Sequence, residues 1–271
     1  MADVWSNPAM NAPQPKANRV LEELGRLLRD PTRAVDEFTL RRFERECRAE
    51  LEDAPTNVAR AGLWATIGQV RFRREDYEGA EHALRNALHF DPLDAFLSMS
   101  LGATLIELGR LSEAREALSA ALSRSHARET RLWTLANLAE LHLRTGDPRA
   151  ARGAMREAVH LADPTSAQDL ALLAFQHAAI DAPHDAAEFF ARSLCAERDI
   201  PRTDEPAIAT IERLEPEWHR RLTRAKKLCA AIETVQTEES AVVDDPAPSA
   251  RVTLTDEQAR RFDAILDGPA P

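Results

Sequence analysis

The chain has 271 residues, of which 30% are charged and 44% hydrophobic, and its net charge is −10. This length and balance fit a folded protein with a buried core and exclude a long disordered or fibrous chain. The negative charge argues against a nucleic-acid binder, because such proteins neutralise phosphates with an excess of Lys and Arg. Few glycines and aromatic residues beside many Ala, Arg, Glu and Leu favour helix throughout, so an all-α fold is predicted.

Cysteine usage indicates a reducing compartment. Cys47, Cys195 and Cys229 are odd in number, far apart and form no C-x-x-C pair, which argues against a disulfide or zinc framework. The N-terminus lacks a basic segment followed by an apolar run, and no stretch of about 18 apolar residues occurs. We therefore expect a cytoplasmic protein of bacterial type, with neither a membrane nor a nucleic acid as its partner.

In chain order, residues 1–15 are rich in Pro, Asn and Ala and predict a disordered lead. Residues 16–55 predict two N-terminal capping helices. Asn18 can cap the first of them, whose apolar residues recur at helical spacing as far as Asp30 and Pro31. Such helices would cover the exposed apolar side of an array of repeats.

A repeat begins at Ala61. When the sequence is compared with itself at an offset of 34 residues, small and apolar residues of 61–94 coincide with those of 95–128. The coincident pairs are Gly68 and Gly102, Ala80 and Ala114, Leu84 and Leu118, and Ala87 and Ala121. Small residues at such positions allow two helices to approach closely, so each unit is interpreted as two helices joined by a turn.

A third unit, 132–164, follows at an offset of 37 residues, and the extra residues are expected in the polar connection before it. Its turn, Gly146-Asp147-Pro148, predicts the end of one helix and the start of another, with a capping aspartate and a proline in first position. A fourth unit, 167–200, lies 35 residues further on and is degenerate, because its turn differs from the others. The predicted array spans 59–201.

Beyond the array, residues 202–235 predict C-terminal capping helices. Their basic residues between Arg220 and Lys227 indicate either a solvated face or a patch for an acidic partner. Residues 236–250 are acidic, contain two prolines and predict a linker. Residues 251–268 predict a short amphipathic docking helix, which would be marginal alone in water and should form by docking. Its apolar stripe includes Phe262, Ile265 and Leu266.

The first unit resembles the tetratricopeptide repeat (TPR) family. The family pattern W-x2-L-G-x2-Y, A-x3-F, A, P is matched by Trp64, Ile67, Gly68, Ala80, Leu84, Ala87 and Pro92. Only the tyrosine is replaced, by Arg71. The resemblance implies an all-α, right-handed α-solenoid of TPR helix-turn-helix repeats with N- and C-terminal capping helices.

The resemblance also implies a place for binding, since such arrays usually hold a peptide or helix of a partner in a concave groove lined by the first helix of each repeat. Carried over to this chain, the partner-binding groove residues are Gln69, Phe72, Phe96, Met99, Ile106, Trp133, Asn137, Glu140, Leu143 and Phe175. This groove would be apolar. Members that clamp a terminal carboxylate use Lys and Asn, whereas the equivalents here are uncharged Ala65, Gln69 and Ser100, so we reject that subtype.

An exposed groove of this kind would be a large apolar patch, and something should cover it. The candidates are a client peptide, a second copy of the protein, or residues 254–266 docked within the same molecule. The alternative is that some of these side chains simply pack between adjacent repeats.

No catalytic, cofactor or metal site is predicted. The sequence contains none of the glycine-rich phosphate motifs, H-E-x-x-H or G-x-S-x-G. The eight histidines are scattered, and the pairs at seven-residue spacing are two helical turns apart, too far for a shared metal without other ligands. We therefore predict that the protein is not an enzyme.

The leading hypothesis is a protein–protein interaction module, an adaptor or chaperone that holds part of another protein in the apolar groove. In this respect the chain is similar to the tetratricopeptide chaperones of type III secretion translocators. Two alternatives stay open, namely a regulatory sensor autoinhibited by its C-terminal helix and a scaffold subunit of a larger enzyme complex.

Overall fold

The computed structural model describes residues 36–216 and 226–241, and every regular element in these ranges is a helix. This confirms the predicted all-α class. The chain divides into two compact units, Met1–Asp163 and Pro164–Pro271. The helices of the first unit are α2 (Glu37–Asp53), α3 (Asn57–Arg73), α4 (Tyr77–Phe90), α5 (Ala95–Glu107), α6 (Leu111–Arg124), α7 (Arg128–Arg144) and α8 (Pro148–Leu161). Those of the second are α9 (Ala167–Ala179), α10 (Pro183–Glu197), α11 (Ala207–Leu214) and α13 (Lys226–Ala241).

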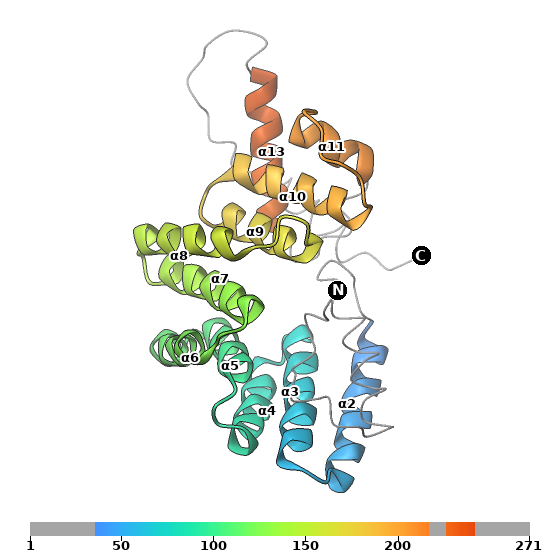
Figure 1. Ribbon diagram of the computed structural model, residues 1–271, viewed down its shortest axis with the longest axis vertical. Coiled ribbons are helices and arrows are strands. Elements are labelled where there is room, and N and C mark those ends of the chain that lie inside the picture. The colour runs from blue at the N-terminus through green and yellow to red at the C-terminus, as the bar shows by residue number, and fades with distance from the viewer. Residues whose placement is uncertain (1–35, 217–225, 242–271) are drawn as a thin grey trace, which may run out of the picture. The chain divides into compact units, whose positions relative to one another are not determined.

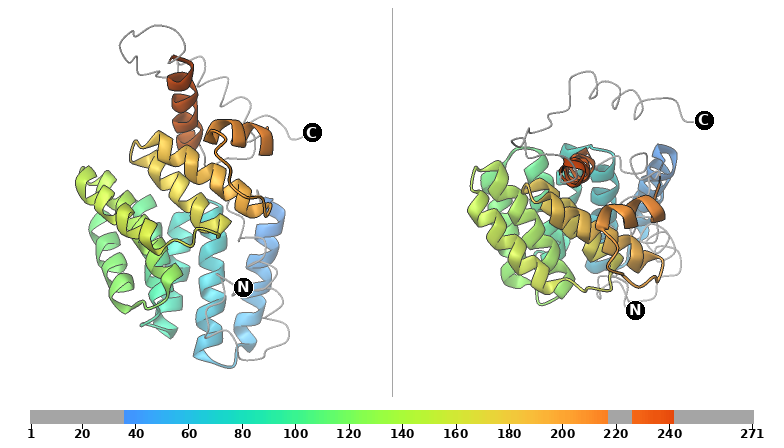
Figure 2. Two further views of the ribbon diagram at one scale, coloured as in Figure 1. Left: turned by 45° about the horizontal axis from the view of Figure 1, so that its top comes forward. Right: turned by 90° about the horizontal axis from the view of Figure 1, so that it is seen from above.

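The helices of the first unit pack as consecutive pairs, α3 with α4, α5 with α6 and α7 with α8, while α2 lies alongside α3 (Figures 1 and 2). Within each pair, a tight turn joins the two helices, and its central residue has a left-handed backbone conformation. These residues are Glu75, Gly109 and Gly146, with φ of 62°, 72° and 78°. They are separated by the offsets of the sequence repeat, so the turn recurs in the same place in every pair.

Each turn also closes with the same backbone hydrogen bond. The N–H of Asp76 donates to the carbonyl of Arg71 at 3.0 Å, and the N–H of Asp147 donates to the carbonyl of His142 at 2.8 Å. Such bonds satisfy carbonyl groups that the helix end would otherwise leave unpaired. Asp76 and Asp147 then cap the following helices, and Pro148 begins α8 as predicted.

Within a pair, the two helices approach so closely that a side chain is excluded. A Cβ atom on Gly68 would lie 2.8 Å from Cγ of Leu84, and one on Gly102 would lie 2.6 Å from Cγ of Leu118. Both distances are shorter than a van der Waals contact, so glycine is required here. In the third pair the equivalent position is Ala139, and its partner is the unbranched Met155 rather than a leucine.

One apolar cluster joins the pairs of the first unit from α4 to α7. It includes Leu84, Leu101, Leu105, Leu118 and Leu141, none of which has more than 7% of its surface exposed. A second cluster fixes α2 on α3 through Cys47, which is fully buried. Burial raises the pKa of the Cys47 thiol to about 12, so this cysteine packs as a small apolar residue.

The second unit begins with α9 and α10, which again form a pair (Figure 1). Their turn contains Asp181 with a φ of 59°, and the N–H of Ala182 donates to the carbonyl of His177 at 2.9 Å. The turn of this degenerate unit therefore has the backbone of the other three, although its sequence differs. Beside the pair, α11 and α13 close a core that includes Phe190, Ile211 and Ile232.

Several predicted segments lie outside the described residues. They are the lead 1–15, the first capping helix, residues 217–225 with part of the basic cluster, and the docking helix with Phe262, Ile265 and Leu266. The predicted linker at 236–250 is described only in its first residues, where the structure differs. Because α13 continues to Ala241, residues 236–241 are helical.

His177 is a buried titratable group in the second unit. It is 8% exposed, its Nδ1 lies 3.0 Å from the carbonyl oxygen of Leu173, and its ring packs 4.9 Å from that of Phe189. Burial lowers the pKa of His177, and the opposing attraction of Asp185 does not restore it. The neutral imidazole is therefore the form that fits this site.

The close approach at Gly102 can be tested against an open helical glycine in the same unit. Gly102→Ala should destabilise the protein, because overpacking costs about 1–3 kcal/mol and outweighs a gain in helix propensity of about 1 kcal/mol. Gly153→Ala on α8 should stabilise it by about 0.5–1 kcal/mol, since nothing lies within 4 Å of the added Cβ. Urea denaturation compares the two variants. Equal shifts in the same direction would contradict the close packing.

Acid should destabilise the protein through His177. Because the pKa of His177 is lowered in the folded state, the unfolded chain binds more protons than the folded one below about pH 6.5. The free energy of unfolding should therefore fall as the pH drops below that value. In His177→Gln this fall should be smaller, whereas in His160→Gln, which changes an exposed histidine, it should match the wild type. Urea denaturation at several pH values measures the free energy of unfolding. If it falls as steeply in His177→Gln as in the wild type, His177 does not cause the acid destabilisation.

Candidate functional site

Most of the predicted groove residues occur on α3, α5 and α7, the first helices of the three pairs of the first unit. Gln69 and Phe72 lie on α3. The residues on α5 are Phe96, Met99 and Ile106, and those on α7 are Trp133, Asn137, Glu140 and Leu143. The tenth residue, Phe175, belongs to α9 in the second unit, where it is partly buried and packs against the core of that unit.

Two of these residues are part of the core, which corrects their interpretation as exposed contacts. Met99 is 7% exposed and Ile106 is 1% exposed, and both belong to the apolar cluster that joins α4 to α7. Packing of α7 on α5 covers them, and Leu141 of α7 is a member of the same cluster. Ile106 therefore has almost no surface that a partner could contact.

The aromatic side chains are only partly buried. Phe96 and Trp133 pack against the apolar cluster with one part of the side chain and keep the rest exposed. Phe72 is also partly buried, and its ring meets that of Tyr77 edge to face at 5.4 Å. Aromatic groups supported in this way keep their orientation in the absence of a ligand.

Arg144 orders the polar side of this surface, and sequence reasoning did not single it out. Its Nη2 lies 2.7 Å from Oε1 of Glu140 and 3.1 Å from Oε2 of Glu107, and its Nη1 donates to the carbonyl of Ile106 at 2.8 Å. Arg144 thus joins α7 to α5 and holds Glu140 in place. Partial burial would lower the pKa of Arg144, but the two carboxylates offset this and the pKa is raised.

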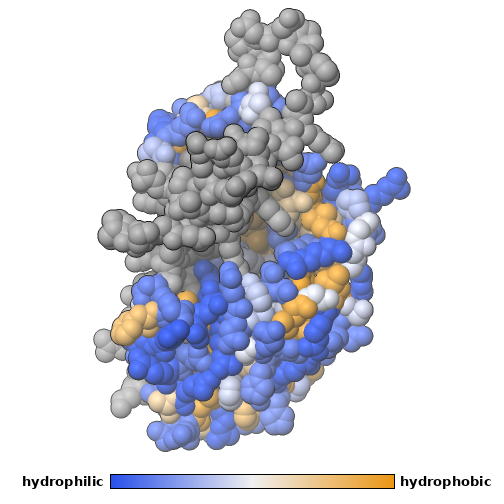
Figure 3. Space-filling view, turned by 180° about the vertical axis from the view of Figure 1, so that it is seen from behind, coloured by the Kyte–Doolittle hydropathy of each residue, from blue (hydrophilic) through white to orange (hydrophobic). Residues whose placement is uncertain are grey.

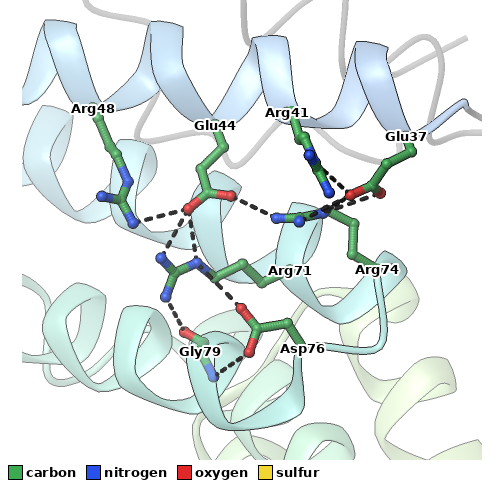
Figure 4. A network of polar contacts seen from close by, with 8 residues as sticks. All are labelled: Glu37, Arg41, Glu44, Arg48, Arg71, Arg74, Asp76 and Gly79. Carbon is green, nitrogen blue, oxygen red and sulfur yellow. Dashed lines mark hydrogen bonds and ion pairs between the residues drawn. The ribbon is translucent and has the colours of Figure 1, made fainter.

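A network of charges joins α2 to the first helix pair (Figure 4). Glu44 of α2 is its centre, with 11% of its side chain exposed. Its carboxylate lies 2.8 Å from Nη2 of Arg71 and 3.0 Å from Nη1 of Arg74, both of which come from the end of α3. Arg48 approaches it from α2 at 2.9 Å. Arg71 replaces the family tyrosine, and here it serves to anchor the preceding helix.

The pKa of Glu44 reflects this arrangement. Burial by itself raises the pKa of the carboxyl, but the hydrogen bond and charge of Arg71, with the charge of Arg48, more than offset it. The pKa is therefore lower than that of an ordinary glutamate, and the carboxylate stays charged. Arg71 also donates to the carbonyl of Gly79 at 3.1 Å, which brings the start of α4 into the same network.

Among residues 36–216 and 226–241, no group of three His, Cys, Asp or Glu side chains is placed to hold a metal ion. The helices of these same ranges include none that is both long enough and apolar enough to cross a membrane. In the rear view, hydrophilic residues cover most of the coloured surface, and apolar residues gather in a few places (Figure 3).

A family model matches part of the chain. Residues 71–136, from the last turn of α3 into α7, match the family model described as tetratricopeptide repeat. The match to the tetratricopeptide repeat covers these residues of the first unit. Such repeats generally act as interaction modules without catalytic activity, so the fold is that of a protein–protein interaction module. Among curated proteins, none matches the sequence significantly.

Solved structures with the same kind of helix pairs are distant in sequence. MamA 41-end from Desulfovibrio magneticus RS-1 has 20% identity and a TM-score of 0.44, over 69% of this chain and 98% of that one. PilF from Pseudomonas aeruginosa has 16% identity and a TM-score of 0.49, over 92% of this chain and 96% of that one. The APC/C hetero-tetramer Cut9-Hcn1 has 16% identity and a TM-score of 0.49, over 83% of this chain and 40% of that one. These likenesses are too weak to carry an argument about this protein.

The anchoring role of Glu44 can be measured directly. Glu44→Gln should lower the free energy of unfolding by about 1–3 kcal/mol, because the arginines lose a charged partner at a largely buried position. Glu52→Gln alters an exposed carboxylate on the same helix and should change it by less than about 0.5 kcal/mol. Chemical denaturation provides both values. If Glu44→Gln unfolds like the wild type, the network does not hold α2.

Proposed function

We propose that the protein is an adaptor or chaperone that binds a peptide or helix of another protein on the first helices of its tetratricopeptide repeats. We define the binding surface as Gln69, Phe72, Phe96, Trp133, Asn137, Glu140 and Leu143, the predicted groove residues of the first unit that are partly exposed. A cytoplasmic location in a bacterial cell is part of the same proposal.

One observation carries the proposal. Phe96 and Trp133 occupy the same position on successive first helices, and both are supported from below by buried leucines while part of each ring is exposed. An aromatic side chain held in this way loses little conformational entropy on binding. Two such groups on neighbouring helices suit apolar anchors at regular spacing along a bound segment.

Polar residues beside these rings favour an ordered, oriented ligand. Glu140 is held by Arg144, so its carboxylate keeps one position. Gln69 and Asn137 offer amide groups that can pair with the backbone of an extended segment or the side chains of a helix. The expected ligand is therefore an apolar segment with polar residues between its anchors.

Peptides selected by phage display against the full chain provide the test. Trp133→Ala should weaken their binding by about 10- to 150-fold, which corresponds to about 1.5–3 kcal/mol for one buried anchor. Isothermal titration measures the dissociation constant. Leu93→Ala is the matched control, because Leu93 is 71% exposed and lies outside the binding surface.

Two further results keep this experiment decisive. Circular dichroism and thermal melts of Trp133→Ala must match those of the wild type, and Phe96→Leu provides a second variant that preserves most of the packing. If the selected peptides bind both surface variants as tightly as the wild type, the proposed surface is wrong.

A further inference from the structure

The outer face of α8 carries an uninterrupted row of basic side chains, which we call the α8 stripe. It consists of Arg149, Arg152, Arg156 and His160, and all four are exposed. At 3.6 residues per turn they fall within about 80° of arc and extend over about 16 Å. In a protein with a net charge of −10, this concentration of one sign on one face is unexpected.

The arginines of the α8 stripe have no ion-pair partner among the described residues. The nearby carboxylates are engaged elsewhere. Glu157 lies 3.4 Å from Nη2 of Arg131, and Asp147 accepts the N–H of Ala150 at 2.9 Å as the helix cap. The guanidinium groups therefore keep their donors available to a ligand.

Near the equivalent helices of the same unit, α4 and α6, arginines form ion pairs with carboxylates of the protein. Arg110, the residue that precedes α6, lies 2.6 Å from both Glu81 of α4 and Glu113 of α6. Arg85 completes this group, 2.8 Å from Glu81 and 3.2 Å from Glu113. These arginines neutralise carboxylates of the protein itself, whereas among the described residues the α8 stripe has no such carboxylates beside its arginines.

The repeat does not require arginine on this face. The positions that correspond to the α8 stripe are Glu78, Glu81, Arg85 and His89 in the first pair and Ser112, Arg115, Ser119 and Ser123 in the second. In these two pairs the positions hold acidic, basic and neutral residues, whereas in the fourth pair the equivalents Ala187, Ala191 and Cys195 are buried. Only the third pair is basic at all four, so packing does not account for the pattern.

The face is also open. Apart from the backbone of α8 and the two neighbouring residues, nothing lies within 4 Å of the place where a Cβ on Gly153 would stand, and Gly153 follows Arg152 on the side of the helix that bears the stripe. A ligand could therefore approach the arginines along the helix without displacing another side chain.

We propose that the α8 stripe binds an acidic segment of a partner protein. Planar guanidinium groups form paired hydrogen bonds with carboxylates, and arginines three and four residues apart match carboxylates that recur at the same spacing on a helix. Phosphate polymers fit less well, because three arginines neutralise few of their phosphates. The α8 stripe shares no residue with the aromatic binding surface, so a negative result for one proposal leaves the other standing.

The test uses the full chain and a fluorescein-labelled helical peptide of about twelve residues with glutamates at i and i+4 spacing. Fluorescence anisotropy at low ionic strength should show binding, and the same peptide with glutamine in place of glutamate should bind at least about tenfold more weakly. Arg152→Glu with Arg156→Glu should reduce the affinity for the acidic peptide by at least about tenfold.

The matched control is Arg45→Glu with Arg115→Glu, which changes the net charge equally at two exposed, separate sites. It should reduce the affinity less than about threefold. Equal losses in both double variants would overturn the proposal, because the loss would then follow from the added negative net charge and not from the position of the α8 stripe. Thermal melts of both variants should match the wild type, as all four side chains are exposed.

Two other outcomes would also overturn it. If single-stranded oligothymidine of similar length binds as tightly as the acidic peptide, the stripe is a phosphate site. If removal of residues 242–271 raises the affinity for the peptide more than about tenfold, the chain's own acidic segment is the occupant rather than a partner protein.

Discussion

The first unit depends on the close approach of two helices within each pair, and this approach depends on the absence of a side chain at one position. At Gly68 and Gly102 a Cβ would overlap a buried leucine of the facing helix. The third pair accommodates Ala139 because the facing side chain is Met155, which has no branch at Cγ. Once a pair is closed, its leucines form the surface on which the next pair packs, and the outer faces are left free to vary.

That freedom explains why charge differs so much from helix to helix. Glu44 and Arg71 join α2 to the first pair at a largely buried site, so their geometry is constrained and the pKa of the carboxyl is lowered. On α4 and α6 the exposed arginines pair with local carboxylates, and on α8 they do not. The same scaffold thus uses arginine for anchoring, for local neutralisation and, in our proposal, for binding.

Sequence alone predicted the helix pairs and the cap at Asp147, because these follow from local spacing and from residues whose conformational preferences are strong. It did not predict the burial of Ile106, since this depends on how closely α7 packs on α5. Nor did it predict the contacts of Arg144, which joins residues far apart in the chain. Long arginine side chains can reach many partners, so their contacts require the tertiary structure.

The recurrent left-handed turn has a consequence for how such a chain can change in length. In all four pairs the turn residue follows the small residue of the first helix by seven positions and precedes the alanine of the second by five. The sequence offsets nevertheless differ. The residues added before the third pair lengthen the start of α7, which has 17 residues against 13 in α5, whereas the residue added before the fourth pair lies in the connection 162–166. The segment from the small residue to the alanine therefore keeps a constant length, and added residues extend either the start of the first helix or the connection that precedes it.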